Sequence, residues 1–272
     1  MPSENMSLQE LVSLTGKKVI VTGGATGIGF AISCRLAEAG ATVLIADRDT
    51  EAAQKAAEEL KNRGYEACFT QCDVSKEEDV TSMVNAAVRE MGGIDILVNN
   101  AGVYPRIPLS QMASSDFEQV ISVNLTGTFL CCRYASEKII EQRRGGSIIN
   151  LASIEALHPS HTGMSAYDAS KGGVLTLTKS LARELGQYDI RVNTIAPGGI
   201  MTQGTVSRIR GESSSEEEKA QLKELKSFMA RIALGRMGDA DDIARVALFL
   251  ASELSSYMTG SLITVDGGYL IS

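Results

Sequence analysis

The fold of this chain is decided by residues 17–29, KKVIVTGGATGIG, in which a short apolar run enters a glycine-rich turn. The residues from Phe30 to Gly40 then have the apolar spacing of a helix that stops at a glycine. Glycines let the chain bend and let a ligand approach the backbone, and the amides and dipole at a helix start attract phosphate. Such a turn can be purely structural, but the strand before it and the helix after it are the context of a dinucleotide site.

Seven apolar runs have the composition of strands, and helical patterns separate the first six. The predicted strands are Lys17–Val21, Thr42–Ala46, Glu66–Gln71, Ile94–Val98, Gly146–Leu151, Arg191–Ile195 and Leu262–Val265. This alternation predicts an α/β fold, a Rossmann-like doubly wound parallel sheet with helices on both faces. The loops at the carboxyl ends of its strands then share one crevice, where ligands bind in such sheets.

A second motif, YDASK at residues 167–171, brings together an acid–base pair. On a helix it places the Tyr167 phenol and the Lys171 ammonium four residues apart on one face. A free tyrosine ionises near pH ~10, and a neighbouring cation lowers its pKa towards the range in which it accepts a proton. The same spacing arises by chance on many helices, so the motif needs support from the rest of the chain.

Four motifs supply that support, and together they resemble the short-chain dehydrogenase/reductase family. The glycine turn has the spacing G-x-x-x-G-x-G, not the commoner G-x-G-x-x-G, and matches the family's T-G-x-x-x-G-x-G loop. Residues 99–102 match its N-N-A-G motif, residues 167–171 its Y-x-x-x-K motif, and residues 197–202 its P-G-x-x-x-T segment. The resemblance implies an NAD(P)-dependent oxidoreductase that interconverts a secondary alcohol and a ketone.

The resemblance also implies four catalytic residues, Asn124, Ser153, Tyr167 and Lys171. Tyr167 would take the alcohol proton while hydride leaves for the nicotinamide, and Ser153 would hydrogen-bond the substrate oxygen. Lys171 would lower the pKa of Tyr167 and contact the nicotinamide ribose. Asn124 would help hold a water chain from Lys171 to solvent, although an asparagine in a predicted helix can also be structural. Ser153 lies fourteen residues before Tyr167, about one more than is usual in the family, so we expect an insertion that alters the substrate wall.

The choice of cofactor depends on the end of the second predicted strand. Asp47 lies there, about 20 residues after the glycine turn, where a carboxylate accepts hydrogen bonds from the adenosine ribose and repels a 2′-phosphate. We therefore expect NAD(H) rather than NADP(H), although the adjacent Arg48 can bind a phosphate and Asp47 can instead cap a helix. The expected cofactor-binding residues are Gly23, Thr26, Gly27, Ile28, Gly29, Asp47, Asp73, Val74, Asn100, Ala101, Gly102, Tyr167, Lys171, Pro197, Gly198, Ile200 and Thr202.

Polar side chains gather in the segments expected to surround the substrate. They are Glu155, His158 and His161 before Tyr167, and Tyr104 and Arg106 after the N-N-A-G motif. Such groups suit a hydroxyl-rich sugar, polyol or sugar acid, but they equally fit a solvated loop. On the first interpretation, the expected substrate contacts are Ser153, Glu155, Tyr104 and His161.

Three alternatives to a sugar or polyol substrate remain open. Residues 257–260 and 265–268 also resemble those of 3-oxoacyl thioester reductases, which usually take NADPH. A hydroxysteroid or other alicyclic alcohol is a second possibility. The third is a regulator that binds NAD(H) without turnover, but such proteins typically lack the tyrosine or the lysine, and this chain has both.

Composition favours one large α/β unit. The 272 residues are 44% hydrophobic and 22% charged, and we expect a short extension, residues 1–14, before a single catalytic domain, residues 15–272. The net charge of −7 without a basic stripe disfavours nucleic acid and anionic membranes as partners. Residues 1–5 lack the regions of a signal peptide and no run reaches transmembrane length, so we expect a cytoplasmic protein. The five cysteines lack metal-ligand spacing and suggest reduced, mostly buried thiols and no metal.

Two further expectations concern flexibility and assembly. Residues 208–226 are polar and serine-rich, so the region 203–230 is either a solvated surface element or a mobile lid over the crevice. The family resemblance implies a homotetramer, and residues 262–265 with residues 267–272 place apolar surface at a sheet edge that a partner subunit would cover.

Overall fold

The centre of the molecule is a seven-stranded sheet in the order β3-β2-β1-β4-β5-β6-β9, and every neighbouring pair is parallel. The computed structural model describes residues 6–202, 223 and 225–272. The strands are β1 (Lys18–Thr22), β2 (Thr42–Asp47), β3 (Ala67–Gln71), β4 (Ile96–Asn99), β5 (Gly146–Leu151), β6 (Ile190–Pro197) and β9 (Leu262–Val265). The predicted doubly wound parallel sheet is therefore confirmed, with strand ends that shift by no more than two residues.

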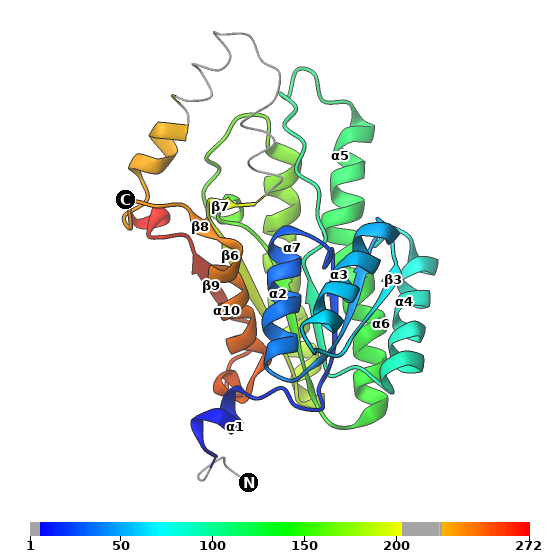
Figure 1. Cartoon of the computed structure of the whole chain (residues 1–272). Helices are drawn as coiled ribbons and strands as arrows, with labels where there is room; N and C mark the ends of the chain where they lie inside the picture. Colours follow the sequence, from blue (N-terminus) through cyan, green and yellow to red (C-terminus); the bar gives the residue numbers. More distant parts are fainter. Residues whose placement is uncertain (1–5, 203–222, 224) are drawn as a thin grey trace.

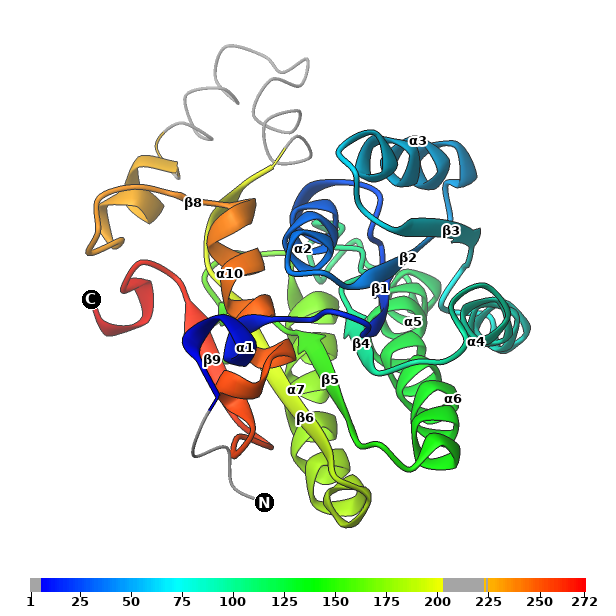
Figure 2. The same ribbon diagram turned by 60° about the horizontal axis from the view of Figure 1, so that its bottom comes forward.

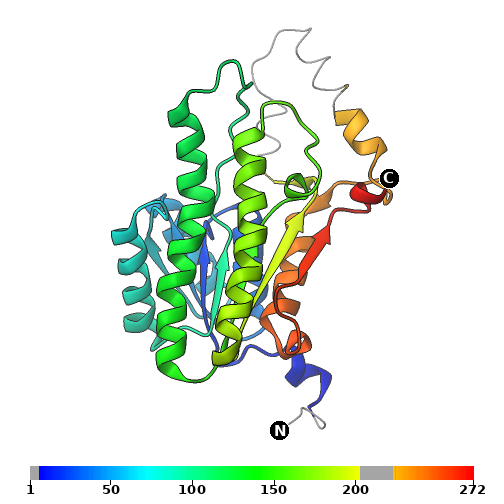
Figure 3. The ribbon, with the colours of Figure 1, turned by 180° about the vertical axis from the view of Figure 1, so that it is seen from behind.

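Helices cover both faces of this sheet (Figures 1 and 2). One face carries α2 (Gly27–Glu38), α3 (Thr50–Asn62) and α10 (Ala240–Ala251). The other carries α4 (Glu77–Met91), α5 (Ser114–Ile121), α6 (Gly127–Gln142) and α7 (Ser165–Leu185), which Figure 3 shows from their own side. Other short elements are the helix α1 (Leu8–Val12) and the 3₁₀ turns Ile154–Ala156, Gly186–Tyr188, Glu253–Ser255 and Tyr269–Ile271.

Each helical layer encloses its own hydrophobic core. Along β1, the side chains of Val19 and Val21 enter the core beneath α2, α3 and α10, and Ile20 enters the core beneath α4, α6 and α7. Because both faces are buried at the centre of the sheet, β1, β2 and β4 contain continuous apolar runs, which is why composition located them without alternation. Leu14, just before the domain that we expected to begin at residue 15, is also buried in the first core.

The glycine turn joins β1 to α2 without room for side chains. Gly23 and Gly27 have φ angles of +59° and +56°, which favour glycine, and an added Cβ on Gly29 would lie 2.0 Å from the Gly23 carbonyl oxygen. The helix begins at Gly27, inside the motif, so the amides of Ile28 and Gly29 belong to its first turn and have no partner within the helix. Amides in this position at a helix start can bind an anion.

Two local elements were not predicted. A short parallel pair joins β7 (Ile200–Met201) to β8 (Gly238–Asp239), and a π-helical turn, Ser122–Thr126, separates α5 from α6. Most of the region proposed as a lid lies outside the described residues, and within the described part residues 225–230 are helical. Over residues 6–202, 223 and 225–272, no helix has the length and apolar character needed to cross a membrane, and no group of side chains is arranged to hold a metal ion. All five cysteines are free thiols, and three of them are buried.

Replacing Gly29 with alanine should destabilise the protein by about 1–3 kcal/mol, because the new methyl group overlaps the Gly23 carbonyl oxygen. Gly186→Ala is the matched control, since nothing lies within 4 Å of its added Cβ. That control should be neutral or stabilise the protein by up to about 1 kcal/mol. Urea unfolding of the two variants provides the comparison, and equal midpoints would show that the turn relaxes around the methyl group.

Candidate active site

A cavity of about 1280 Å³ opens at the carboxyl ends of the strands, where β1 and β4 meet at the point at which the strand order reverses. It is lined by all of the expected cofactor-binding residues except Gly29, and by all four expected substrate residues, Tyr104, Ser153, Glu155 and His161. Of the four residues expected to be catalytic, Ser153, Tyr167 and Lys171 line the cavity, whereas Asn124 lies behind it. Residues far apart in the sequence therefore meet at one site.

The end of the cavity next to β2 holds Asp47 in a fixed orientation. Its Oδ2 accepts a hydrogen bond from the Ala25 amide of the glycine turn at 3.3 Å, and its Oδ1 accepts one from the Asp49 amide at 3.2 Å. The residue that caps α3 is Asp49, whose side chain accepts from the Ala52 amide. The helix-capping role considered for Asp47 thus belongs to Asp49, and Asp47 and Arg48 both line the cavity.

Asp73 and Val74 form the adjoining wall after β3. The Asp73 carboxylate accepts hydrogen bonds from the Ser75 hydroxyl at 2.6 Å and the Ser75 amide at 3.1 Å, and these hold its pKa below the usual value. The Val74 side chain packs on Gly127 so closely that an added Cβ there would lie 2.8 Å from it. This wall is therefore rigid and ionised at neutral pH.

Tyr167 and Lys171 project from α7 into the opposite end. The Lys171 ammonium donates to the Leu151 carbonyl at 2.8 Å and lies 5.8 Å from the centre of the Tyr167 ring. Burial lowers the pKa of Lys171 to about 8 and raises that of Tyr167 to about 12, although a hydrogen bond with Ser153 opposes the second shift. Desolvation is thus the largest influence on the Tyr167 pKa, and the expectation that Lys171 brings this pKa down stays a prediction.

Asn124 is completely buried in the π-helical turn, and both the oxygen and the nitrogen of its side-chain amide are hydrogen-bonded. Its Oδ1 accepts from the Val103 amide at 2.8 Å, and its Nδ2 donates to the Val103 carbonyl at 2.8 Å and to the Ser170 hydroxyl at 3.0 Å. Ser170 in turn donates to the Tyr167 carbonyl at 2.7 Å. The Asn124 side chain thus ties the loop after β4 to the helix that carries Tyr167, which is the structural role that we left open beside the catalytic one.

The loop between Ser153 and Tyr167 is held by a buried carboxylate. Glu155 accepts a hydrogen bond from the Ser160 amide at 2.8 Å and from the Ser160 hydroxyl, and His161 Nδ1 lies 3.1 Å from its Oε1. Burial alone would raise the pKa of Glu155, but the hydrogen bonds from His161 and Ser160 outweigh it and hold the pKa below its usual value. The inner side of the loop therefore carries a buried, ionised carboxylate, whereas residues 157–159 are exposed.

Asp168, beside Tyr167, adds a second acidic group. Burial raises its pKa to about 6, the charge of Glu155 raises it further, and His161 opposes both. Its Oδ1 is buried without a hydrogen-bond partner in the described part of the chain. Two carboxyl groups thus lie near Tyr167 and favour its neutral form.

Sequence reasoning missed the apolar side of this cavity. Phe228, Met164 and Met237 line it, and the Phe228 ring stacks on the His161 ring at 5.6 Å between centroids. No motif pointed to Phe228, because its position depends on how the chain returns to the cavity after residue 202. Only the short apolar stretch at residues 228–229, after a polar region, hinted at a buried face.

Comparison with known proteins finds similarity to reductases. A family model described as enoyl-(acyl carrier protein) reductase matches residues 23–270. The chain is 44% identical over 257 residues to a 3-oxoacyl-[acyl-carrier-protein] reductase of Chlamydia pneumoniae, covering 94% of this chain and 98% of that protein.

Solved structures agree over almost the whole length. A short-chain type dehydrogenase/reductase from Mycobacterium marinum is 36% identical with a TM-score of 0.88, covering 98% of this chain and 100% of that chain. A 7α-hydroxysteroid dehydrogenase complexed with NADH and 7-oxo glycochenodeoxycholic acid is 32% identical with a TM-score of 0.87, covering 97% and 98%. The motifs, the fold and these matches show that the chain belongs to the short-chain dehydrogenase/reductase family of oxidoreductases.

Proposed function

We propose that this protein is an NAD(H)-dependent oxidoreductase that interconverts a secondary alcohol and a ketone, with a sugar, polyol or sugar acid as its substrate. The observation that carries the proposal is the meeting of Ser153, Tyr167 and Lys171 with the glycine turn in one cavity. A nucleotide-sensing regulator would not need these three groups together. Residues 15–272 form the single catalytic domain in this proposal.

The residues at the adenosine end of the cavity fit a dinucleotide. An added Cβ on Gly23 would lie 2.9 Å from the Ala101 Cα, so the turn packs directly on the loop after β4. Gly23, Gly27 and Ile28 of the turn line the cavity, where their backbone would meet a pyrophosphate. Asp47, held by the Ala25 amide, would accept hydrogen bonds from the ribose hydroxyls, and Val74 would contact the adenine. When bound, the oxidised nicotinamide would accept the hydride and its positive charge would favour the phenolate.

The chain's own side chains would then handle the proton. Tyr167 would accept the alcohol proton at its phenolic oxygen, and Ser153, already hydrogen-bonded to Tyr167, would hold the substrate oxygen beside it. Lys171, fixed by the Leu151 carbonyl, would contact the nicotinamide ribose and add positive charge near the phenolate. Asn124 would keep the loop after β4 and α7 in register, so that both sides of the site keep their separation.

The polar wall supports a hydroxyl-rich substrate. Glu155 and His161 offer an ionised acceptor and an imidazole on the cavity surface, and the Tyr104 ring stands edge-on to Tyr167 with centroids 6.2 Å apart. The runner-up is a 3-oxoacyl thioester, favoured by the 44% identity to the chlamydial reductase, and an alicyclic alcohol such as a steroid is third. A panel of polyols, sugar acids, steroids and acyl thioesters, followed by NAD(P)H absorbance with both cofactors, tests the three. Turnover of acyl thioesters alone would replace the polyol proposal.

Tyr167→Phe should keep cofactor affinity and lose turnover by a factor on the order of 10²–10⁴, because it removes the proton acceptor and little packing. Tyr188→Phe removes the same hydroxyl from an exposed ring outside the cavity and should leave the rate unchanged. The measurements are the steady-state rate with the best substrate of the panel and cofactor binding by fluorescence. A wild-type rate in Tyr167→Phe would contradict the mechanism.

Asp47→Ser should narrow the preference for NAD⁺ over NADP⁺, because an unfavourable carboxylate–phosphate contact disappears while Arg48 remains at the cavity. The control is Asp49→Ser, which removes the same charge two residues later, outside the cavity, and leaves a side chain able to cap α3. The measurement is the ratio of kcat/KM with NAD⁺ to kcat/KM with NADP⁺ in wild type and in both variants. A wild-type enzyme that already prefers NADPH would contradict the assignment of Asp47.

Light scattering at micromolar concentration should give the mass of a homotetramer. The edge strand β9 has partly exposed side chains, and nearby segments expose Tyr257 completely and Ile271 to 89%. Such an edge and such apolar groups favour cover by another subunit. A mass of one chain would contradict this assembly.

A further inference from the structure

We propose that Arg231 is a positioning residue for the substrate, because it holds the loop of residues 157–163 against the wall of the cavity. The proposal rests on the proposed function in one respect, namely that this loop faces the substrate. Arg231 does not line the cavity, so it acts through the residues that it binds. We call Arg231, Tyr269, Phe228 and His161 the aromatic clip.

Arg231 joins three segments that are far apart in the sequence. Its guanidinium lies 4.3 Å from the centre of the Tyr269 ring, and its Nη1 lies 3.0 Å from His158 Nε2 and 3.2 Å from the Tyr269 hydroxyl. Its Nη2 donates to the Ser272 carbonyl at 3.3 Å, and the Ser272 hydroxyl donates back to the Arg231 carbonyl. One planar group with several donors thus connects the substrate loop to the last described residues.

A ladder of rings returns from this point to the same loop. Tyr269 stacks on Phe228 with centroids 4.5 Å apart, and Phe228 stacks on His161 at 5.6 Å. His161 lies three residues after His158, so the contacts form a closed circuit through the loop. Of these residues, His161 and Phe228 line the cavity. The position of two wall residues therefore depends on contacts that Arg231 makes outside the cavity.

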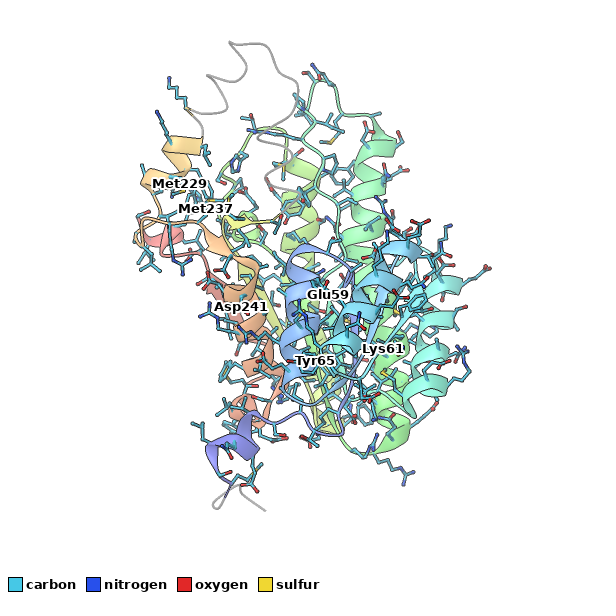
Figure 4. All side chains as sticks on the ribbon, in the orientation of Figure 1. Glu59, Lys61, Tyr65, Met229, Met237 and Asp241 are labelled. Carbon is cyan, nitrogen blue, oxygen red and sulfur yellow. The ribbon has the colours of Figure 1, made fainter. Side chains whose placement is uncertain are left out.

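The clip also touches the segment expected to contact the cofactor. An added Cβ on Gly199 would lie 2.4 Å from Phe228 Cε1, so the Phe228 ring packs directly on the backbone after β6. Tyr269 is buried in a small hydrophobic cluster with Ile154 and Ile232. Met229 and Met237 pack against this cluster and lie near one another in Figure 4. The clip thus connects the substrate loop to a well-packed part of the molecule.

The loop needs this outer attachment. Glu155 holds Ser160 and His161 on its inner side, and Arg106 and the Ile107 amide donate to the carbonyls of residues 162 and 163. Residues 157–159 are exposed, and the side chain of His158 contacts the rest of the protein through Arg231 and the Tyr269 ring. Exposed loops with few buried contacts open at low free-energy cost, and small displacements of wall residues weaken substrate positioning. Loss of Arg231 should therefore loosen the loop before it affects the sheet.

Arg231→Ala should raise KM for the best substrate of the panel on the order of tenfold, with a smaller change in kcat and no change in the cofactor dissociation constant. Arg231→Lys should fall between, because one ammonium cannot span His158, Tyr269 and Ser272. Arg89→Ala is the matched control, since this exposed arginine on α4 pairs with Glu90, away from the cavity. If Arg231→Ala leaves KM unchanged, the proposal is wrong.

A second measurement does not depend on turnover. Hydrogen exchange of the protein without substrate should be faster in residues 157–163 of Arg231→Ala, and of His158→Ala, than in wild type or Arg89→Ala. Exchange in the strands should stay the same. Faster exchange spread over the whole sheet, or wild-type exchange in the loop, would overturn the proposal. If no alcohol on the panel is turned over, the proposed function fails, but this exchange experiment still decides whether Arg231 holds the loop.

Discussion

The end of β1 packs so closely on the loop after β4 that Gly23 has no room for a Cβ, and the geometry of the site depends on this close approach. The Thr22 hydroxyl oxygen accepts hydrogen bonds from the amides of Asn100 at 3.1 Å and Ala101 at 3.2 Å, and the Asn100 side chain donates to the carbonyls of Thr22 and Gly23. These bonds lock the glycine turn onto its neighbouring loop where the strand order reverses. A ligand that enters here meets backbone amides on one side and α7 on the other.

What the sequence predicted best were features with a fixed local geometry. The glycine turn needs positive φ angles and close contacts, and the spacing of its glycines indicates both. The four-residue spacing of Tyr167 and Lys171 places them on one helix face, and both line the same cavity. The central strands β1, β2 and β4 were predictable because both faces of the sheet are covered there, so that each contains a run of buried apolar residues. Most of the expected cofactor residues line the cavity because they follow strands at their carboxyl ends, whereas Tyr167 and Lys171 reach it from α7.

The rest depends on packing between distant segments. The Asn124 side chain, in the π-helical turn, makes hydrogen bonds to the loop after β4 and to α7. No local sequence pattern predicts these contacts. The place of Phe228 depends on Tyr269 and Gly199, which come from other segments. The pKa of Tyr167 could not be predicted from its spacing to Lys171, because desolvation is a property of the assembled cavity.

Burial acts on both members of the Tyr167–Lys171 pair in the direction of the neutral form, since it raises the pKa of the phenol and lowers that of the ammonium. Glu155 and Asp168 add negative charge that works against the phenolate as well. Burial and these two carboxylates therefore favour protonated Tyr167, the form that would donate a proton in the ketone reduction that we propose. The reverse reaction would need the phenolate, and a cation brought with the ligand would favour that form. Linkage makes this reciprocal: a cation that lowers the pKa of Tyr167 binds more tightly once the tyrosine has lost its proton.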